Sequence, residues 1–193
     1  CRICPTYLTY DQEVFKVAGL SSICILKTKR GRGLSRLLMS YVNKLIDQRG
    51  YDFAYLVARR AADHFYNRFG FLGASSYPSV RILPSRRGNR STTLAVKGFD
   101  SGNSAIYNQL YKTSYQYSFG ASLRNKEFWS KVEERIKIQN NLKFREFSED
   151  GKIVGYGIEC DKKIVELGIG EDAINQIIEY YVQEHKEVSI LEL

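Results

Sequence analysis

Residues 30–36 form a basic, glycine-rich stretch, Arg-Gly-Arg-Gly-Leu-Ser-Arg, whose residue types suit the binding of a phosphate. Gly31 and Gly33 let the backbone approach a ligand closely, and the three arginines supply positive charge. When such a stretch leads into a helix, it presents unpaired N–H groups and the positive end of the helix dipole at one point. The pattern therefore predicts a site for a phosphate or pyrophosphate.

Two common phosphate-binding loops do not fit this stretch. A dinucleotide-binding fingerprint needs a third glycine at position 36, where the chain has Arg36. A Walker loop ends in Gly-Lys followed by Ser or Thr, and residues 30–36 have no such ending. A basic turn that only caps an ordinary helix stays open as the alternative.

The elements that must position this stretch can be read on both sides of it. An apolar run at residues 21–26 predicts a strand before it, paired as a hairpin with a strand at residues 13–18. Apolar residues at helical spacing predict an amphipathic helix over residues 34–50. A second apolar run, at residues 53–58, predicts another strand. The expected order is strand, basic turn, helix, strand.

Two sequence blocks in this order resemble one family. Residues 30–35 resemble the Arg/Gln-x-x-Gly-x-Gly/Ala signature of the GNAT acyl-CoA-dependent N-acetyltransferases, with Ser35 as a small residue in place of the usual Gly or Ala. Residues 62–71, Ala-Asp-His-Phe-Tyr-Asn-Arg-Phe-Gly-Phe, are similar to the block that carries the general-acid tyrosine of this superfamily, which would be Tyr66. The spelling around Tyr66 resembles the Eis-like (enhanced intracellular survival) family, in which tandem GNAT domains precede a sterol-carrier-protein-like domain.

The resemblance implies an α+β (mixed α/β) fold of tandem GNAT-type domains. Each domain would be a twisted, mostly antiparallel sheet with a parallel, splayed strand pair and flanking helices. We expect residues 1–97 to be the C-terminal part of a catalytic, acetyl-CoA-binding domain. We expect residues 98–193 to be a second, degenerate and truncated domain, since hairpin, strand, helix and strand recur there. Its turn at residues 168–172 has two carboxylates and no arginine, which argues against pyrophosphate binding.

The resemblance also implies which residues bind acetyl-CoA. Backbone N–H groups of residues 31–35 would hold the pyrophosphate, with arginine side chains around it. The strand that ends at Ile25 and Leu26 would pair with the pantetheine arm, and one of its N–H groups would polarise the acetyl carbonyl. The implied binding residues are Ile25, Leu26, Arg30, Gly31, Arg32, Gly33, Leu34, Ser35 and Arg36.

Tyr66 is the implied general acid. It would give its proton to the departing thiolate, because a phenol has a reference pKa of about 10 against about 8.5 for a thiol. The alternative is an aromatic residue that packs between Phe65 and Phe69. No general base can be assigned, because His64 is a helical neighbour two residues from Tyr66 and would point elsewhere.

The acceptor and the partners are less defined. The resemblance suggests a primary amine, either a small cationic molecule such as an aminoglycoside or polyamine or a lysine side chain, and it hints at a homo-oligomer. Residues 1–97 carry 17 Lys and Arg against 5 Asp and Glu, whereas residues 98–193 carry 12 against 16. A basic half suits an anionic coenzyme, but it also suits nucleic acid.

Two alternatives to an enzyme therefore stay open. The first is a basic nucleic-acid-binding module, although the basic residues gather in the turn and in a loop at residues 84–91, and the second half is acidic. The second is a non-catalytic scaffold that binds acyl-CoA without turnover. Steep salt dependence of binding to DNA or RNA would favour the module, and coenzyme binding without turnover would favour the scaffold.

Composition sets further expectations. No apolar run approaches the length of a membrane span, so we expect a cytoplasmic protein with no membrane partner. Cys1 and Cys4 have no second pair or histidine at zinc-ligand spacing, so we expect reduced thiols and no metal site. The 193 residues begin without methionine and inside an expected domain, so the chain reads as a fragment.

Overall fold

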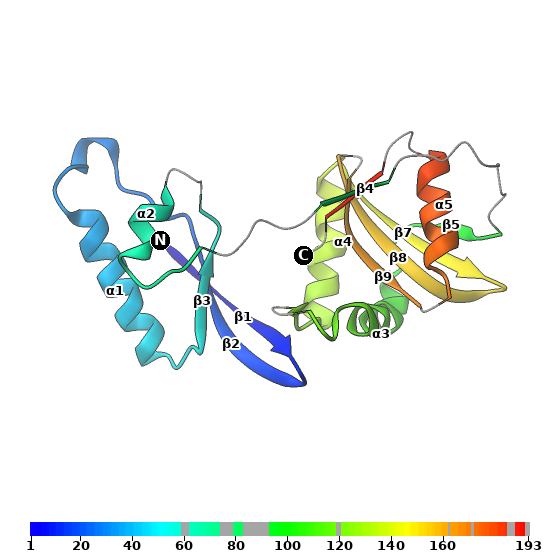
Figure 1. The fold of residues 1–193 in the computed structure, drawn as a ribbon, viewed down its shortest axis with the longest axis horizontal. Helices are drawn as coiled ribbons and strands as arrows, with labels where there is room; N and C mark the ends of the chain where they lie inside the picture. Colours follow the sequence, from blue (N-terminus) through cyan, green and yellow to red (C-terminus); the bar gives the residue numbers. More distant parts are fainter. Residues whose placement is uncertain are drawn as a thin grey trace. The chain divides into compact units, whose positions relative to one another are not determined.

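The computed structural model describes residues 1–58, 62–73, 79–82, 93–118, 121–161, 163–170, 172–184 and 188–191. The basic loop predicted at residues 84–91 lies outside these ranges. The chain divides into two compact units (Figure 1). Unit 1 comprises Cys1–Ser75 and Tyr117–Leu123, and unit 2 comprises Ser76–Gln116 and Arg124–Leu193. Among the described residues, no helix combines the length and the apolar character that crossing a membrane requires.

Unit 1 is built, within the described residues, on a four-stranded mixed sheet of order β3-β2-β1-β6. Its strands are β1 (Arg2–Tyr10), β2 (Glu13–Ser21), β3 (Phe53–Leu56) and β6 (Ala121–Ser122). β1 and β2 form an antiparallel hairpin whose turn holds Asp11 and Gln12 at φ 46° and 69°. β2 and β3 run parallel up to the pair of Leu20 and Leu56. The unit therefore contains the parallel strand pair that the resemblance implied.

The strand predicted at residues 21–26 is wrong. β2 ends at Ser21, and Ser22 has φ 53°, a left-handed value that interrupts extended backbone. Residues 22–26 form no strand, so the hairpin joins β1 and β2 rather than residues 13–18 and 21–26. The parallel pair likewise lies at residues 17–20 and 53–56, and β3 stops at Leu56 rather than at residue 58.

The predicted amphipathic helix is present as α1 (Leu34–Gln48). Its buried residues Met39, Val42 and Ile46 recur at spacings of three and four, as one face of a helix requires. They pack against Ala18 and Leu20 of β2 and form the core of unit 1. Two short elements complete this unit, the 3₁₀ turn η1 (Lys27–Lys29) and α2 (Asp63–Asn67).

Unit 2 contains, within the described residues, a six-stranded sheet of order β4-β10-β9-β8-β7-β5. Its strands are β4 (Ser79–Ile82), β5 (Ala95–Lys97), β7 (Leu142–Glu149), β8 (Lys152–Cys160), β9 (Lys163–Ile169) and β10 (Val188–Leu191). Its helical elements are η3 (Ser101–Asn103), α3 (Ser104–Tyr115), α4 (Lys126–Ile138) and α5 (Ile174–Glu184). β8 and β9 are antiparallel, whereas β9 and β10 are parallel and joined through α5. The order β8-β9-α5-β10 thus repeats the order β1-β2-α1-β3 of unit 1.

Strands are exchanged between the two halves of the sequence. β4 and β5 precede residue 98, yet they pair with β10 and β7 in the sheet of unit 2. β6 follows residue 98, yet it pairs with β1 in unit 1, where Thr9 Oγ1 donates to the carbonyl of Ala121 at 3.1 Å. The division in space therefore does not coincide with a single cut in the chain.

The core of unit 2 is aromatic and contains buried carboxylates. Tyr156 is fully buried and its ring stacks on Phe144, with the centroids 5.2 Å apart. Its hydroxyl donates to Glu166 at 2.8 Å, and the hydroxyl of Tyr107 donates to Glu146 at 2.6 Å. Burial, together with the hydrogen bond to Glu146, raises the pKa of Tyr107, so this phenol stays a neutral donor.

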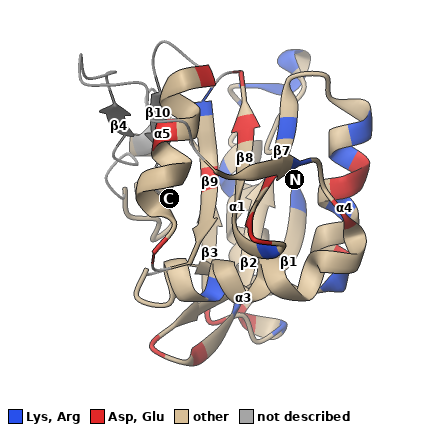
Figure 2. Ribbon diagram, turned by 90° about the vertical axis from the view of Figure 1, so that its right-hand side faces the viewer, with Lys and Arg blue, Asp and Glu red and all other residues tan. Residues whose placement is uncertain are grey.

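α4 begins at a capping residue and carries charges of both signs along its length (Figure 2). Asn125 Oδ1 accepts a hydrogen bond from the N–H of Phe128 at 2.8 Å. Lys131 and Lys137 each pair with a glutamate four residues earlier. The cap satisfies one of the N–H groups that the first turn of a helix leaves without an intrahelical partner.

Replacing Asn125 by Ala should lower the free energy of unfolding of unit 2 by about 1 kcal/mol, because the cap is lost. Asn125→Asp should retain stability, since its carboxylate can accept the same bond and suits the helix dipole. Urea denaturation followed by the fluorescence of Trp129, the one tryptophan of the chain and a residue of α4, measures both variants. Equal losses of unfolding free energy in Asn125→Ala and Asn125→Asp would contradict a capping role.

Candidate functional site

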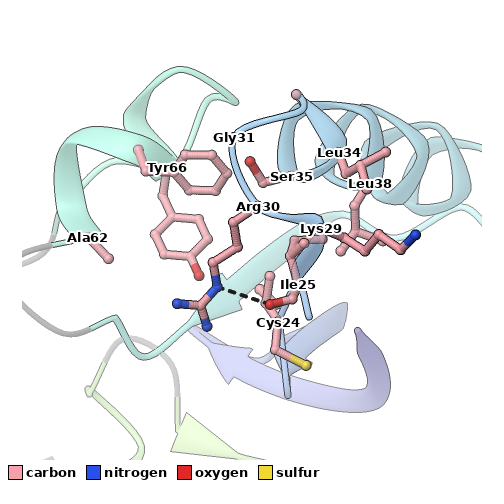
Figure 3. A pocket seen from close by; sticks show the side chains of 13 residues that line it. Cys24, Ile25, Lys29, Arg30, Gly31, Leu34, Ser35, Leu38, Ala62 and Tyr66 are labelled. Carbon is pink, nitrogen blue, oxygen red and sulfur yellow. Dashed lines mark hydrogen bonds between the residues drawn. The ribbon is translucent and has the colours of Figure 1, made fainter. Parts of the chain in front are cut away.

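A pocket of about 610 Å³ lies in unit 1, where the turn after β2, the start of α1 and the short helix α2 meet (Figure 3). These segments are brought together by the core of the unit, because residues of α1 and α2 pack on the same face of the sheet. The basic turn and Tyr66, which are distant in sequence, therefore border one cavity.

The basic turn contributes backbone donors to this pocket. Gly31 and Gly33 have φ 76° and 73°, values that favour glycine, and Gly33 is the N-cap of α1. No side chain caps α1, and the N–H groups of residues 31–35 have no hydrogen-bond partner in the part of the chain that the structure describes. The N–H of Arg36 is the first to be used, donating to the carbonyl of Gly33 at 3.0 Å. The turn is therefore a set of unsatisfied donors at the positive end of a helix.

Arg30 crosses the pocket. Its Nε donates to the carbonyl oxygen of Ile25 at 3.1 Å. Figure 3 shows the side chain running from the turn toward Ile25 and Tyr66, away from the start of α1. The end of the Arg30 side chain thus lies near the hydroxyl of Tyr66.

The parallel strands part beside the pocket. Pairing of β2 and β3 ends at Leu20 and Leu56, and within the described ranges residues 22–26 have no strand partner. Ile23 and Ile25 line the pocket, whereas Val57 beyond β3 is 87% exposed. Extended backbone without a sheet partner can accept an added chain as a strand would.

Tyr66 is held in a cluster of aromatic rings on α2. Its ring packs edge-on against Phe65, with the centroids 5.1 Å apart. Asn43 Nδ2 of α1 donates to the carbonyl of Phe69 at 3.0 Å, which ties the segment after α2 to α1. The ring of Tyr66 is half-buried, and Figure 3 shows its hydroxyl pointing toward Arg30. The ring of Tyr66 therefore packs against Phe65 while its hydroxyl faces the pocket.

Most of the predicted site residues border the pocket. Those that line it are Ile25, Arg30, Gly31, Gly33, Leu34, Ser35 and Tyr66. Leu26 is 74% exposed, and neither it nor Arg32 nor Arg36 belongs to the lining. His64 is exposed and is also not part of the lining.

Other lining residues were not anticipated. These are Ile23, Cys24, Lys29, Leu38, Ala62 and Phe65. Leu38 follows from helical spacing, since it lies one turn after Leu34, whereas Phe65 is only the sequence neighbour of Tyr66. Ile23 and Cys24 lie in residues 22–26, which the sequence predicted as a strand and which form none. In the described residues, no group of three or more His, Cys, Asp or Glu side chains is arranged to hold a metal ion.

Comparison with solved structures identifies similar folds. The chain superposes on a GCN5-related N-acetyltransferase from Anabaena variabilis with a TM-score of 0.74 at 17% identity, over 97% of this chain and 50% of that one. Eis1 from Mycobacterium abscessus gives 0.66 at 18% identity, over 97% and 51%. A probable N-acyltransferase from Enterococcus faecalis gives 0.69 at 15% identity, over 97% and 50%. The chain thus spans about half the length of these proteins.

Comparison with protein families concerns the first unit. Residues 1–73 match the family described as Acetyltransferase (GNAT) domain. No match was found among curated proteins. The matched residues include β1, β2, α1, β3 and α2, and with them the whole lining of the pocket. Residues 1–73 are therefore similar to a GNAT acetyltransferase domain, and the chain has a mixed α/β GNAT fold that contains a parallel strand pair and flanking helices.

Proposed function

We propose that this protein is an N-acetyltransferase that moves an acetyl group from acetyl-CoA directly to a primary amine. The observation that carries the proposal is the pocket, which joins a turn of unsatisfied N–H donors to the hydroxyl of Tyr66. The GNAT domain at residues 1–73 supports the reaction class.

The basic turn would hold the pyrophosphate of the coenzyme. The N–H groups of residues 31–35, which include Leu34 and Ser35, would donate to phosphate oxygens. The open space at Gly31 and Gly33, where an added Cβ would meet nothing within 4 Å, leaves room for an approaching ligand. Arg32 and Arg36 lie outside the lining, so they would contribute through longer-range attraction. Donors, space and charge all fit an anionic group.

The unpaired segment after β2 would hold the pantetheine arm. Ile25 and Leu26 carry backbone groups that no neighbouring strand uses among the described residues. An arm laid along this segment would extend toward Tyr66, and one of these two N–H groups would polarise the acetyl carbonyl. Tyr66 would hold a proton at Oη and deliver it to the departing sulfur.

The acceptor would be a small cationic amine, such as an aminoglycoside or polyamine, or a lysine side chain. This part of the proposal rests on the similarity to Eis1. We also propose action in the cytoplasm, which suits the four free cysteines, and a homo-oligomeric assembly.

The proposal extends to a tandem arrangement, with a catalytic domain ending near residue 97 and a second, degenerate domain from residue 98. The repeated order of strands and helix supports it. The turn of unit 2 also differs from residues 31–35, because the N–H of Gly170 already donates to Val154 at 2.9 Å. The N–H of Ala173 donates to the carbonyl of Gly170 at 3.2 Å. We expect this second turn to bind no coenzyme.

Calorimetric titration with acetyl-CoA tests the proposal. Gly33→Asp should weaken binding by about 100-fold or more, because it places a carboxylate against the phosphates. Gly33→Asn is the matched control, since Asn has the same shape and tolerates the φ of 73° but carries no charge.

Each result of this titration has a distinct meaning. A much smaller loss of acetyl-CoA affinity in Gly33→Asn than in Gly33→Asp supports a phosphate at the turn. Equal losses would point to backbone strain, and no binding by the unaltered protein would overturn the proposal. Binding without acetylation of any amine in a panel of polyamines, aminoglycosides and lysine peptides would identify a scaffold rather than an enzyme.

A further inference from the structure

The hydrogen bond between Arg30 and Ile25 places a cation on the wrong side of the pocket for phosphate binding. Nε of Arg30 donates to the carbonyl of Ile25, five residues earlier, at 3.1 Å. The guanidinium is directed toward Tyr66 and away from the start of α1, where the unsatisfied N–H groups lie (Figure 3). Arg30 must therefore rotate before it can reach a group bound at those N–H groups.

The carbonyl that Arg30 occupies is one that a bound arm would need. Pantetheine carries two amide N–H donors, which seek backbone acceptors when it lies along an unpaired segment. The carbonyl of Leu26 already accepts from the N–H of Lys29 at 2.8 Å. The carbonyl of Ile25 accepts from Arg30, and the guanidinium also fills space at the lining. Arm and Arg30 would thus compete for one acceptor and one volume.

A phosphate would shift this competition. Arg30 directly precedes Gly31, its side chain is exposed, and rotation of its side-chain torsions can carry it toward the start of α1. A hydrogen bond between a guanidinium and a phosphate is stronger than one to a neutral carbonyl, because both partners are charged. A phosphate at the turn would therefore draw Arg30 away from Ile25.

We infer that Arg30 is a specificity-determining residue. It closes the arm slot, the space beside Ile25 where the pantetheine arm would lie, until a phosphate draws its side chain away. The inference rests on the proposed function, because it assumes that the pocket takes an acyl carrier. Donors with a phosphate, such as coenzyme A, draw Arg30 away and free the carbonyl of Ile25. Short thioesters without phosphate must displace Arg30 unaided. The site thus discriminates against them by blocking the slot, in addition to lacking a phosphate contact.

The distinguishing experiment measures two ligands against Arg30→Met, which keeps the length of the side chain and removes its charge and donors. Binding of coenzyme A should weaken by about 10-fold, because a charge-assisted contact is lost. Binding of pantetheine, which has no phosphate, should tighten by about 2- to 10-fold, the equivalent of one hydrogen bond. Ligand-observed NMR titration suits the weak affinity of pantetheine, and thermal unfolding verifies that the variant is folded.

Arg32→Met is the matched control, since Arg32 is a cation of the same turn that lies outside the lining. Arg32→Met should weaken the binding of coenzyme A and leave the binding of pantetheine unchanged. The inference is supported if the affinities for the two ligands change in opposite directions in Arg30→Met and not in Arg32→Met. We call the movement of Arg30 away from Ile25 the switch. An unchanged or weakened pantetheine affinity, or no gain because neither protein binds it, overturns the switch and leaves Arg30 as a simple phosphate contact. Failure of the unaltered protein to bind coenzyme A would instead refute the proposed function.

Discussion

Replacing Tyr66 by Phe should lower kcat by about 100-fold or more and leave the KM for acetyl-CoA nearly unchanged, because only a proton donor is removed. The ring that packs on Phe65 is retained, so the fold of α2 should not change. Release of free thiol from acetyl-CoA in the presence of an accepted amine measures kcat. Calorimetry with coenzyme A shows whether binding persists.

Tyr41→Phe is the control for this substitution. Tyr41 lies on α1, is 60% exposed and does not line the pocket, so losing its hydroxyl should not affect turnover. An unchanged kcat in Tyr66→Phe would show that another group or water protonates the leaving sulfur. Equal falls in kcat and in coenzyme affinity would assign Tyr66 a role in binding.

Replacing Gly157 by Ala should destabilise unit 2 by about 3 kcal/mol, because the added methyl group has no space. A Cβ at Gly157 would lie 2.1 Å from Oη of Tyr181 and 3.2 Å from Cδ2 of Leu167. Tyr181 is fully buried on α5, in the core cluster that also contains Phe147. A closely packed core cannot absorb such an overlap without moving α5 or β8. Urea denaturation measures the loss.

A second substitution tests this explanation. Tyr181→Phe removes the oxygen at 2.1 Å, and the nearest remaining ring atom, Cζ, would lie 3.1 Å from the new Cβ. Tyr181→Phe alone supplies the reference value, because removing this buried hydroxyl changes stability by itself. The double variant should lose less free energy of unfolding than the two single variants lose in sum, by about 1 kcal/mol or more.

Gly98→Ala provides the baseline for a glycine substitution. A Cβ at Gly98 would meet nothing within 4 Å, so stability should change by no more than about 0.5 kcal/mol. If Gly157→Ala were equally mild, the overlap with Tyr181 would not limit the packing of α5. If the two losses in the double variant were additive, the contact between these two positions would not be the cause.

The parts of the site that could be predicted are those that local chemistry specifies. The glycines at positions 31 and 33 adopt left-handed φ values at the helix start, and α1 follows from apolar residues at helical spacing. Tyr66 borders the same pocket as this turn. Each of these features depends on a few consecutive residues, so the sequence is sufficient to locate it.

Features that depend on distant pairing were missed or misplaced. Asp11 and Gln12 make the hairpin turn in left-handed conformations without a glycine, so the end of β1 carried no usual signal. Residues 22–26 are as apolar as a strand, but the φ of Ser22 separates them from β2. Ile23 and Cys24 thereby become part of the pocket lining. Short strands such as β6, with two residues, show no periodicity at all.

The exchanged strands determine when each sheet can be finished as the chain leaves the ribosome. Thr9 of β1 cannot meet Ala121 of β6 until 112 further positions have been added. Ile82 of β4 likewise cannot pair until Val188 of β10 has been added. Closing such long segments slows folding, and the edges of both sheets stay uncovered meanwhile. The order of synthesis therefore leaves β4 without its partner strand until residues 188–191 have been made.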